Sequence, residues 1–294
     1  MQLQPAKRTQ ARIRLCLQGP SGSGKTFSAL LLAYGLCGDW SRIAVIDTEH
    51  YSASLYAHLG AYQVLPLREP FSPERYQEAV QVCENAGMQV IILDTISFEW
   101  QFLLDYHASL SGNSFTNWSK VTPRHNQFIK ALLLSPAHIM ATARTKQEYV
   151  LSDKQGKLVP EKVGLKSIQR DDLDYEFTLV FDLDTRNQAT ASKDRTSLFQ
   201  GKPAQLLTSE TGKLIRQWCE QGSPVEPPLT VREQIARCTT LKELQQLYHR
   251  YPEQQGYLKP EYQRQKLALI KSTLTQNHLI TSNLNQNGKH HPSH

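Results

Sequence analysis

Gly19-Pro20-Ser21-Gly22-Ser23-Gly24-Lys25-Thr26 sets the architecture that we expect for this chain of 294 residues. The stretch fills every fixed position of the phosphate-binding pattern G-x-x-x-x-G-K-[ST]. An apolar run from Ile13 to Leu17 precedes it and predicts a buried strand, while residues 27–36 predict a helix. In that context the N–H groups of the loop and the positive end of the helix dipole face a phosphate. We therefore predict that residues 19–26 bind a nucleoside triphosphate.

Two side chains of this loop have expected roles. Lys25 would reach the β- and γ-phosphates, and the Thr26 hydroxyl would bind Mg²⁺. The alternative interpretation is a glycine-rich turn without a ligand. The Lys-Thr pair in register, between a predicted strand and a predicted helix, argues against that alternative.

Composition narrows the class of protein. Hydrophobic residues make up 39% and charged residues 20% of the chain, no apolar run reaches the length of a membrane span, and the first residues lack a secretory signal. The five cysteines are scattered and never spaced C-x-x-C, which argues against disulfides and zinc. We expect a cytoplasmic protein without membrane contact. The net charge of +6 permits a polyanionic partner without requiring one.

Apolar runs alternate with helical patterns from residue 11 to about residue 222. Such runs predict a mainly parallel sheet covered by helices on both faces, which is an α/β fold. A strand pair is expected to turn at residues 185–187. The predicted strands are residues 13–17, 43–46, 90–93, 139–143, 177–182 and 188–192, and the predicted helices are 27–36, 73–87 and 124–134.

The rest of the chain divides into four further parts. Residues 1–10 are polar and expected to be loose, and 223–228 form a proline-rich linker after the core of residues 11–222. Capping-box patterns at 230–233 and 240–243, and Pro260 in a first turn, predict a helical appendage over 229–275. The polar tail 276–294 is expected to be disordered, and its histidines could alternatively bind a metal.

Two acidic residues follow predicted strands. Asp94 ends the run Val90-Ile-Ile-Leu93 about seventy residues after the phosphate loop, as in a Walker B motif, and is the expected carboxylate on the Mg²⁺ side. Glu49 follows the strand 43–46. It is a candidate base for orienting the attacking water, or alternatively an ordinary exposed carboxylate.

These motifs together resemble the RecA/RadA recombinase core. The phosphate loop is followed by Asp47-Thr-Glu49-His50, by Tyr56, by Leu93-Asp94-Thr95 and by a strand ending in Thr-Ala-Arg144-Thr-Lys146. The chain is most similar to compact phage and prophage RecA-like ATPases of AAA type, some of which act in single-strand annealing and recombination. The resemblance covers about residues 11–220 and implies a RecA-like P-loop NTPase fold.

The resemblance implies roles for further residues. Glu49 matches the catalytic glutamate, and Tyr56 matches an aromatic residue that stacks on adenine, although it could equally be a core tyrosine. Thr142 falls where recombinases carry a glutamine that senses the γ-phosphate. Lys193 and Arg195 match basic residues that reach into the ATP site of a neighbouring subunit, which implies a homo-oligomer, ring or filament. Without the resemblance they could be a solvated basic turn.

Two long segments interrupt the alternation and are candidates for binding single-stranded DNA. Residues 97–121 are rich in aromatic residues, among them Trp118, and 146–174 carry lysines. In recombinases, loops at these places grip the strand, because lysines neutralise phosphates and aromatic rings stack on bases. The alternative for the aromatics is packing within a lid or against a neighbour. The lysine candidates are Lys154, Lys157, Lys162 and Lys166.

The function expected from these observations is an Mg²⁺-dependent ATPase that acts on single-stranded DNA in recombination, annealing or replication of a mobile element. One alternative is a nucleotide-dependent switch or scaffold that binds a protein through the helical appendage. A P-loop small-molecule kinase is a further alternative. Glu49 and Lys193-Asp-Arg195 argue against the kinase, because a kinase must exclude water from its site.

Overall fold

The computed structural model describes residues 5–154, 157–170, 173–224 and 231–271, with the side chains of residues 147–154, 157–166, Asp174 and Glu253 excepted. The chain divides into two compact units, residues 1–224 and 225–294. Most of the predicted linker 223–228 and the whole predicted tail 276–294 lie outside the described residues. Within the described ranges, no helix is both long enough and apolar enough to span a bilayer.

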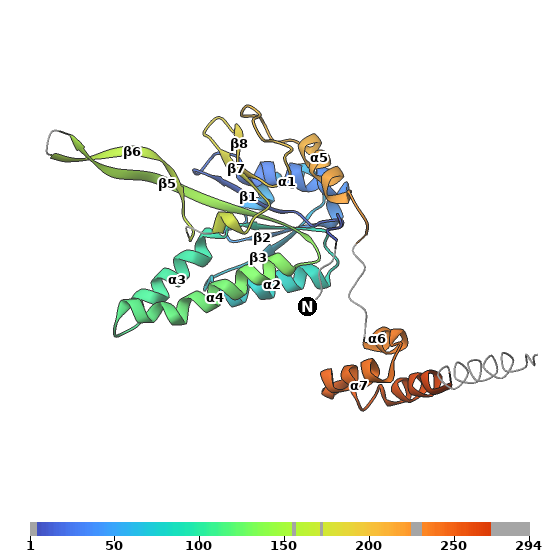
Figure 1. Cartoon of the computed structure of the whole chain (residues 1–294). Coiled ribbons are helices and arrows are strands. Elements are labelled where there is room, and N and C mark those ends of the chain that lie inside the picture. The colour runs from blue at the N-terminus through green and yellow to red at the C-terminus, as the bar shows by residue number, and fades with distance from the viewer. Residues whose placement is uncertain (1–4, 155–156, 171–172, 225–230, 272–294) are drawn as a thin grey trace, which may run out of the picture. The chain divides into compact units, whose positions relative to one another are not determined.

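The first unit is a sheet whose strand order is β3-β2-β4-β5-β1-β7-β8, with β6 paired to β5 (Figure 1). The pairings from β3 to β7 are all parallel, and β6 and β8 are antiparallel to their neighbours. The strands are β1 (Arg14–Gly19), β2 (Ile43–Asp47), β3 (Gln63–Pro66), β4 (Val90–Asp94), β5 (His138–Lys154), β6 (Lys157–Ser167), β7 (Leu179–Leu183) and β8 (Ala189–Asp194). The predicted α/β fold, a mainly parallel sheet flanked by helices, is confirmed.

Helices cover both faces of this sheet. Figure 1 shows α1 and α5 on one face and α2, α3 and α4 on the other. The α-helices of the first unit are α1 (Lys25–Cys37), α2 (Pro73–Asn85), α3 (Ser97–Ser109), α4 (Ser114–Leu134) and α5 (Ser209–Glu220). Short 3₁₀ helices span Trp40–Arg42, Ser52–Leu59 and Leu173–Tyr175.

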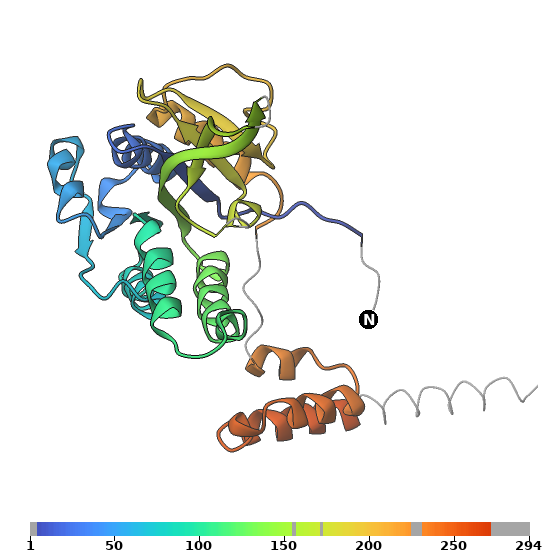
Figure 2. The same cartoon turned by 90° about the vertical axis from the view of Figure 1, so that its left-hand side faces the viewer.

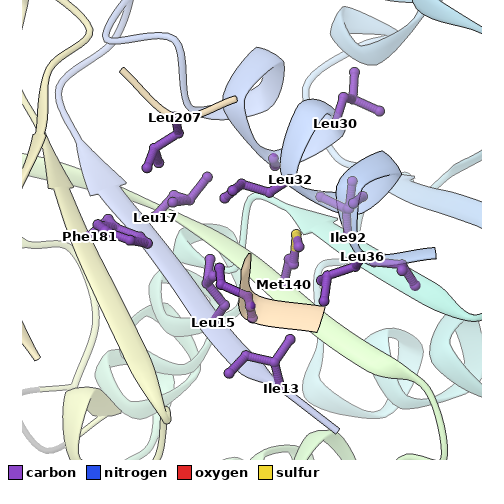
Figure 3. Packing of buried hydrophobic residues seen from close by; sticks show 14 of the residues in the cluster. Ile13, Leu15, Leu17, Leu30, Leu32, Leu36, Ile92, Met140, Phe181 and Leu207 are labelled. Atoms are coloured by element: carbon purple, nitrogen blue, oxygen red, sulfur yellow. The ribbon is translucent and has the colours of Figure 1, made fainter. Parts of the chain in front are cut away.

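The central strands are buried on both faces because their residues alternate between two cores. Leu15 and Leu17 of β1 pack against α1 and α5, whereas Cys16 packs into the cluster formed with α2 and α4. Strand β4 repeats the pattern with Ile92 on the first side and Ile91 on the second. A side-chain period of two in a doubly covered sheet requires apolar residues at every position, as the sequence shows. Figure 3 shows the core on the α1 side.

Helix α1 approaches α5 closely because glycines meet at their crossing. A Cβ built on Gly212 would lie 2.3 Å from the carbonyl oxygen of Leu32 and 2.8 Å from the Cα of Gly35. No larger residue fits at this crossing without moving the helices apart.

The two segments that we expected to be loops are regular. Residues 97–121 form α3 and the first part of α4, which lie side by side in Figures 1 and 2. The predicted start of a helix at Arg124 is therefore wrong by ten residues. Helix α4 runs through Pro123, because one buried face with Asn117, Val121, His125 and Phe128 continues across the proline.

The second segment forms a long antiparallel hairpin of β5 and β6 that projects from the sheet (Figure 1).

The chain start also differs from expectation, since residues 8–10 contact α5 and the residues that follow it. Arg8 packs its guanidinium over the Trp218 ring, and the Gln10 N–H donates to the Ser223 carbonyl. These contacts anchor the beginning of the core.

The second unit contains α6 (Val231–Arg237), α7 (Leu241–Arg250), a 3₁₀ turn (Pro252–Gln254) and a helix over residues 259–271. The helices that we predicted to begin near Thr230 and Thr240, and with Pro260 in a first turn, are present. Thr240 and Glu243 form a reciprocal capping box at the start of α7. A small apolar cluster of Ile235, Leu244, Leu247, Leu258 and Tyr262 holds these helices together.

Candidate nucleotide-binding site

The phosphate loop joins the end of β1 at Gly19 to the start of α1 at Lys25. Gly22 and Gly24 both adopt left-handed backbone conformations, with φ of 80° and 77°, which residues other than glycine rarely adopt. Among the described residues, no side chain caps the first turn of α1, and the buried hydroxyl of Ser23 has no hydrogen-bond partner. Uncapped N–H groups at a helix start and an unpaired buried hydroxyl fit an anionic phosphate.

Lys25 folds back over this loop. Its ammonium donates to the carbonyls of Gly19 at 3.0 Å and Pro20 at 2.8 Å. Burial lowers the pKa of Lys25, and the nearby carboxylates of Asp94 and Glu49 oppose that shift. The lysine is thus placed between the loop and both predicted acidic residues.

Asp94 is buried at the carboxyl end of β4 and accepts hydrogen bonds from two threonines. The Thr26 hydroxyl donates to Oδ2 at 2.7 Å, and the Thr142 hydroxyl donates to Oδ1 at 2.6 Å. Burial raises the pKa of Asp94, whereas both hydroxyl donors lower it. Because β5 lies between β1 and β4, Thr142 bridges the gap between the phosphate-loop strand and the Asp94 strand.

Glu49 lies just beyond β2, where its carboxylate forms an ion pair and its backbone N–H donates a hydrogen bond. Arg144, from β5, donates to Glu49 Oε1 through Nε at 2.8 Å, and its Nη2 lies 2.7 Å from the same oxygen. Asp47 accepts from the Glu49 N–H at 2.7 Å and from the Ala53 N–H at 3.0 Å. The buried Asp47 carboxylate therefore shapes the turn that carries Glu49. The sequence motifs did not single out either Arg144 or Asp47 for these roles.

Tyr56 lies in the 3₁₀ helix that follows this turn. Its ring centroid is 5.7 Å from that of Phe27, which directly follows Thr26 and is 37% exposed. Two aromatic rings therefore meet beside the start of α1. Phe27 was not among the predicted residues, although its position next to the Lys-Thr pair could have indicated it.

Lys193 and Arg195 do not join this site. Strand β8 runs antiparallel to β7, so Ala189 pairs with Leu183 near the phosphate loop and Asp194 pairs with Leu179 at the far end. The Arg195 guanidinium donates to the Tyr175 carbonyl at 3.0 Å, and the Lys193 ammonium lies 5.8 Å from the Tyr175 ring centroid. Both basic residues thus lie at the end of the sheet that is opposite the phosphate loop of their own chain.

The candidates for DNA binding fall into two groups. The Trp118 ring stacks on Trp100 at 6.0 Å and on His107 at 4.3 Å between centroids, so it packs within the α3–α4 pair. This arrangement favours the packing interpretation of Trp118. The four lysines 154, 157, 162 and 166 lie along the β5–β6 hairpin, where Lys154 pairs with Lys157 at the tip, and their side chains lie outside the described part.

Residues 11–206, more than half of the chain, match a family described as AAA domain. The chain belongs to the AAA domain family. This AAA domain protein is similar to the KaiC-like protein PH0186 from the hyperthermophilic archaeon Pyrococcus horikoshii OT3, at 15% identity and a TM-score of 0.38, over 66% of this chain and 83% of that one. No curated protein matches it. The predicted AAA-type P-loop NTPase is thus confirmed at the level of the family.

Proposed function

We propose that this AAA domain protein is an Mg²⁺-dependent ATPase that works as a homo-oligomer on single-stranded DNA. The observation that carries the proposal is the buried Asp94 carboxylate, which accepts hydrogen bonds from Thr26 and Thr142. The charges of Asp94 and Glu49 both act on the Lys25 ammonium. A hydroxyl and a carboxylate beside a phosphate loop are the oxygen ligands that Mg²⁺ prefers.

Each residue of the site has a separate task in this proposal. The loop from Gly19 to Thr26 holds the phosphates through N–H groups, and Lys25 leaves the Gly19 and Pro20 carbonyls to bind phosphate oxygens. Thr26 and Asp94 hold Mg²⁺, which when bound supplies positive charge against the phosphates. Glu49 orients the attacking water, and Thr142 orients Asp94. Tyr56 and Phe27 offer their rings to the base.

The position of Lys193 and Arg195 supports a site shared between subunits. Both lie at the end of the sheet opposite their own phosphate loop, so they do not complete their own ATP site, and we assign them to the ATP site of a neighbour. Positive charge supplied in this way would stabilise the transferring phosphoryl group. An oligomer, ring or filament, follows from this role.

The β5–β6 hairpin supports single-stranded DNA as the partner. It leaves the sheet just after Arg144, the residue that holds Glu49, and it carries four candidate lysines. Bound phosphates on this hairpin would act on the position of Arg144 and hence on Glu49. ATP binding would favour the DNA-gripping state, and hydrolysis would release the strand.

Steady-state ATP hydrolysis with and without single-stranded DNA tests this function, with Lys25→Ala as the blank. We expect turnover in the wild type that the DNA stimulates and that Lys25→Ala abolishes. Hydrolysis indifferent to DNA, together with no salt-sensitive binding, would contradict the DNA role and favour the nucleotide-dependent switch that binds a protein. Absence of hydrolysis under all conditions would contradict the ATPase itself.

A further inference from the structure

The second unit of the chain carries most of its excess positive charge. Residues 231–271 contain eight lysines and arginines against four glutamates and no aspartate, a net charge of +4 out of the +6 of the whole chain. All eight cationic residues are exposed. A small unit so unevenly charged attracts polyanions over a distance set by ionic strength.

Two of these cationic residues line a groove between α6 and α7. Its volume is about 280 Å³, and Arg237 and Arg250 both line it. The lining residues have helical spacing, so each helix turns one face toward the groove. They are Gln234, Arg237 and Cys238 from the α6 side, and Glu243, Gln246, Leu247 and Arg250 from α7.

The two arginines of the groove are available to a ligand. Among the described residues, neither Arg237 nor Arg250 has an ion pair or a hydrogen bond from its guanidinium, although Arg232 pairs with Glu261 at 2.8 Å in the same unit. The acidic residue of the groove is already engaged, since the Glu243 carboxylate accepts from Thr239 N–H, Thr239 Oγ1 and Thr240 N–H. The groove therefore offers two guanidinium groups as donors, and its one carboxylate already accepts hydrogen bonds at the start of α7.

We propose that the α6–α7 groove is a phosphate-binding site through which the second unit holds single-stranded nucleic acid. A guanidinium matches the oxygens of a phosphate in a bidentate manner, and glutamine amides add neutral donors. The site does not include the β5–β6 hairpin, so it gives the protein a second place at which to bind the single-stranded nucleic acid. This proposal rests on the proposed function in one respect only, since both name single-stranded nucleic acid as the partner.

Other anionic partners fit the groove less well. A membrane surface would need an exposed apolar face at the groove, but Leu247, the one leucine that lines it, is buried with Ile235 and Leu244, and the exposed Leu267 and Ile270 do not line it. A protein partner would need apolar or aromatic anchors at the centre of the contact. The groove offers only Leu247 and Cys238, and Leu247 is buried.

The experiment uses the full-length protein and a labelled oligothymidine, with affinity measured over a range of salt concentrations. The variant Arg237→Gln/Arg250→Gln removes the two groove charges. The matched control, Arg264→Gln/Lys266→Gln, removes two exposed charges of the same unit that do not line the groove. Circular dichroism of both variants verifies the fold, and Arg237→Glu/Arg250→Glu provides a stronger perturbation of the same site.

We expect the groove variant to lose affinity about tenfold and its salt slope to fall by about 1.4, since each single-strand phosphate contact contributes about 0.7. The control should lose less than about threefold, because screened charges outside the contact act weakly. Equal losses in both variants, or no loss in the groove variant, would overturn the site. Selective loss of binding to phosphatidylserine vesicles or to polyglutamate, with oligothymidine binding intact, would also overturn it.

The outcome separates this site from the proposed function. A wild type that binds oligothymidine, with the groove variant unaffected and the variant lacking lysines 154, 157, 162 and 166 impaired, would refute the groove and retain the hairpin. A wild type that binds no oligothymidine would refute both the groove and the DNA role. ATP hydrolysis is not needed for either result.

Discussion

Arg144 and Glu49 are 95 positions apart in the sequence and are joined by an ion pair of 2.7 Å. The same guanidinium lies 4.7 Å from the centroid of the Phe98 ring at the start of α3. The backbone of Arg144 is also tied on both sides, since its N–H donates to Ser97 Oγ and its carbonyl accepts from the Ile168 N–H after β6. One arginine thus connects the hairpin base, α3 and the proposed catalytic glutamate.

Replacing Arg144 by methionine should release Glu49. We expect ATP turnover without DNA to rise about threefold to fivefold, because a partly exposed ion pair contributes at most about 1 kcal/mol. The KM for ATP should stay unchanged, the stimulation by DNA should shrink, and Arg144→Lys should keep part of the restraint. A fall of kcat to the level of Glu49→Gln would instead mean that Arg144 contacts the phosphates itself.

Replacing Thr142 by valine should weaken Mg²⁺ binding about tenfold, the low end for residues that orient a metal ligand. Asp94 would lose one of the two hydroxyl donors that oppose the effect of burial, so its pKa would rise further. A titration of ATP hydrolysis with Mg²⁺ measures this effect, and Thr142→Ser, which keeps the hydroxyl, is the control. Equal Mg²⁺ affinity in both variants would mean that Thr142 has no part in orienting Asp94.

Mixing two inactive variants tests the shared site. Arg195→Ala should lose turnover through the missing charge in the neighbour's site, and Glu49→Gln should bind ATP without hydrolysing it. Mixed oligomers place an intact Arg195 beside an intact Glu49 at some interfaces, so hydrolysis should return in part. No recovery, in mixtures shown by size-exclusion chromatography to contain both variants, would count against catalysis in trans.

The buried His138 should make stability depend on pH. Burial, with Arg12 and Arg14 nearby, lowers the pKa of His138 from 6.5 to about 3, and its Nδ1 accepts from the Ile13 N–H. Between pH 6.5 and 3 the unfolded chain binds a proton that the folded chain does not, so the free energy of unfolding falls as pH falls.

Replacing His138 by asparagine keeps an acceptor for Ile13 and removes the titration. In chemical denaturation between pH 6.5 and 4, the variant should have a pH slope smaller by up to about 1.4 kcal/mol per unit. Identical slopes in variant and wild type would mean that His138 is protonated in the folded state.

Replacing Gly212 by alanine should destabilise the first unit. The added Cβ would meet the Leu32 carbonyl at 2.3 Å, and forcing the helices apart costs about 1–3 kcal/mol. Thermal unfolding measures the loss. Gly256→Ala, where a Cβ meets nothing within 4 Å, is the control and should leave the melting temperature of the first unit unchanged.

Local patterns predicted the parts of the site that depend on neighbouring residues. The phosphate loop needs only glycines that allow left-handed backbone and a helix that starts at Lys25, and both conditions act over a few positions. Asp94 was predictable because an apolar run ending in a carboxylate marks a strand's end at the ligand edge of a parallel sheet. The alternation of buried runs likewise predicted most of the strands and helices, but not β3, β6, α3 or α5.

Contacts between distant segments were not predictable in the same way. The course of α4 through Pro123 depends on packing that overrides a local signal, and the β5–β6 hairpin depends on pairing between two polar strands without a clear period. The hydrogen bond of Thr142 to Asp94 and the ion pair of Arg144 with Glu49 depend on the strand order, which brings β5 between β1 and β4.

Short-range sequence patterns specify the phosphate loop, the acidic residues beside it and the helices of the second unit, because backbone conformation and side-chain period are local properties. The arrangement of the strands in space sets which residues restrain those carboxylates and places Lys193 and Arg195 away from the phosphate loop of their own chain. Strand direction and register set these relationships, and both result from burying two apolar faces of one sheet at once.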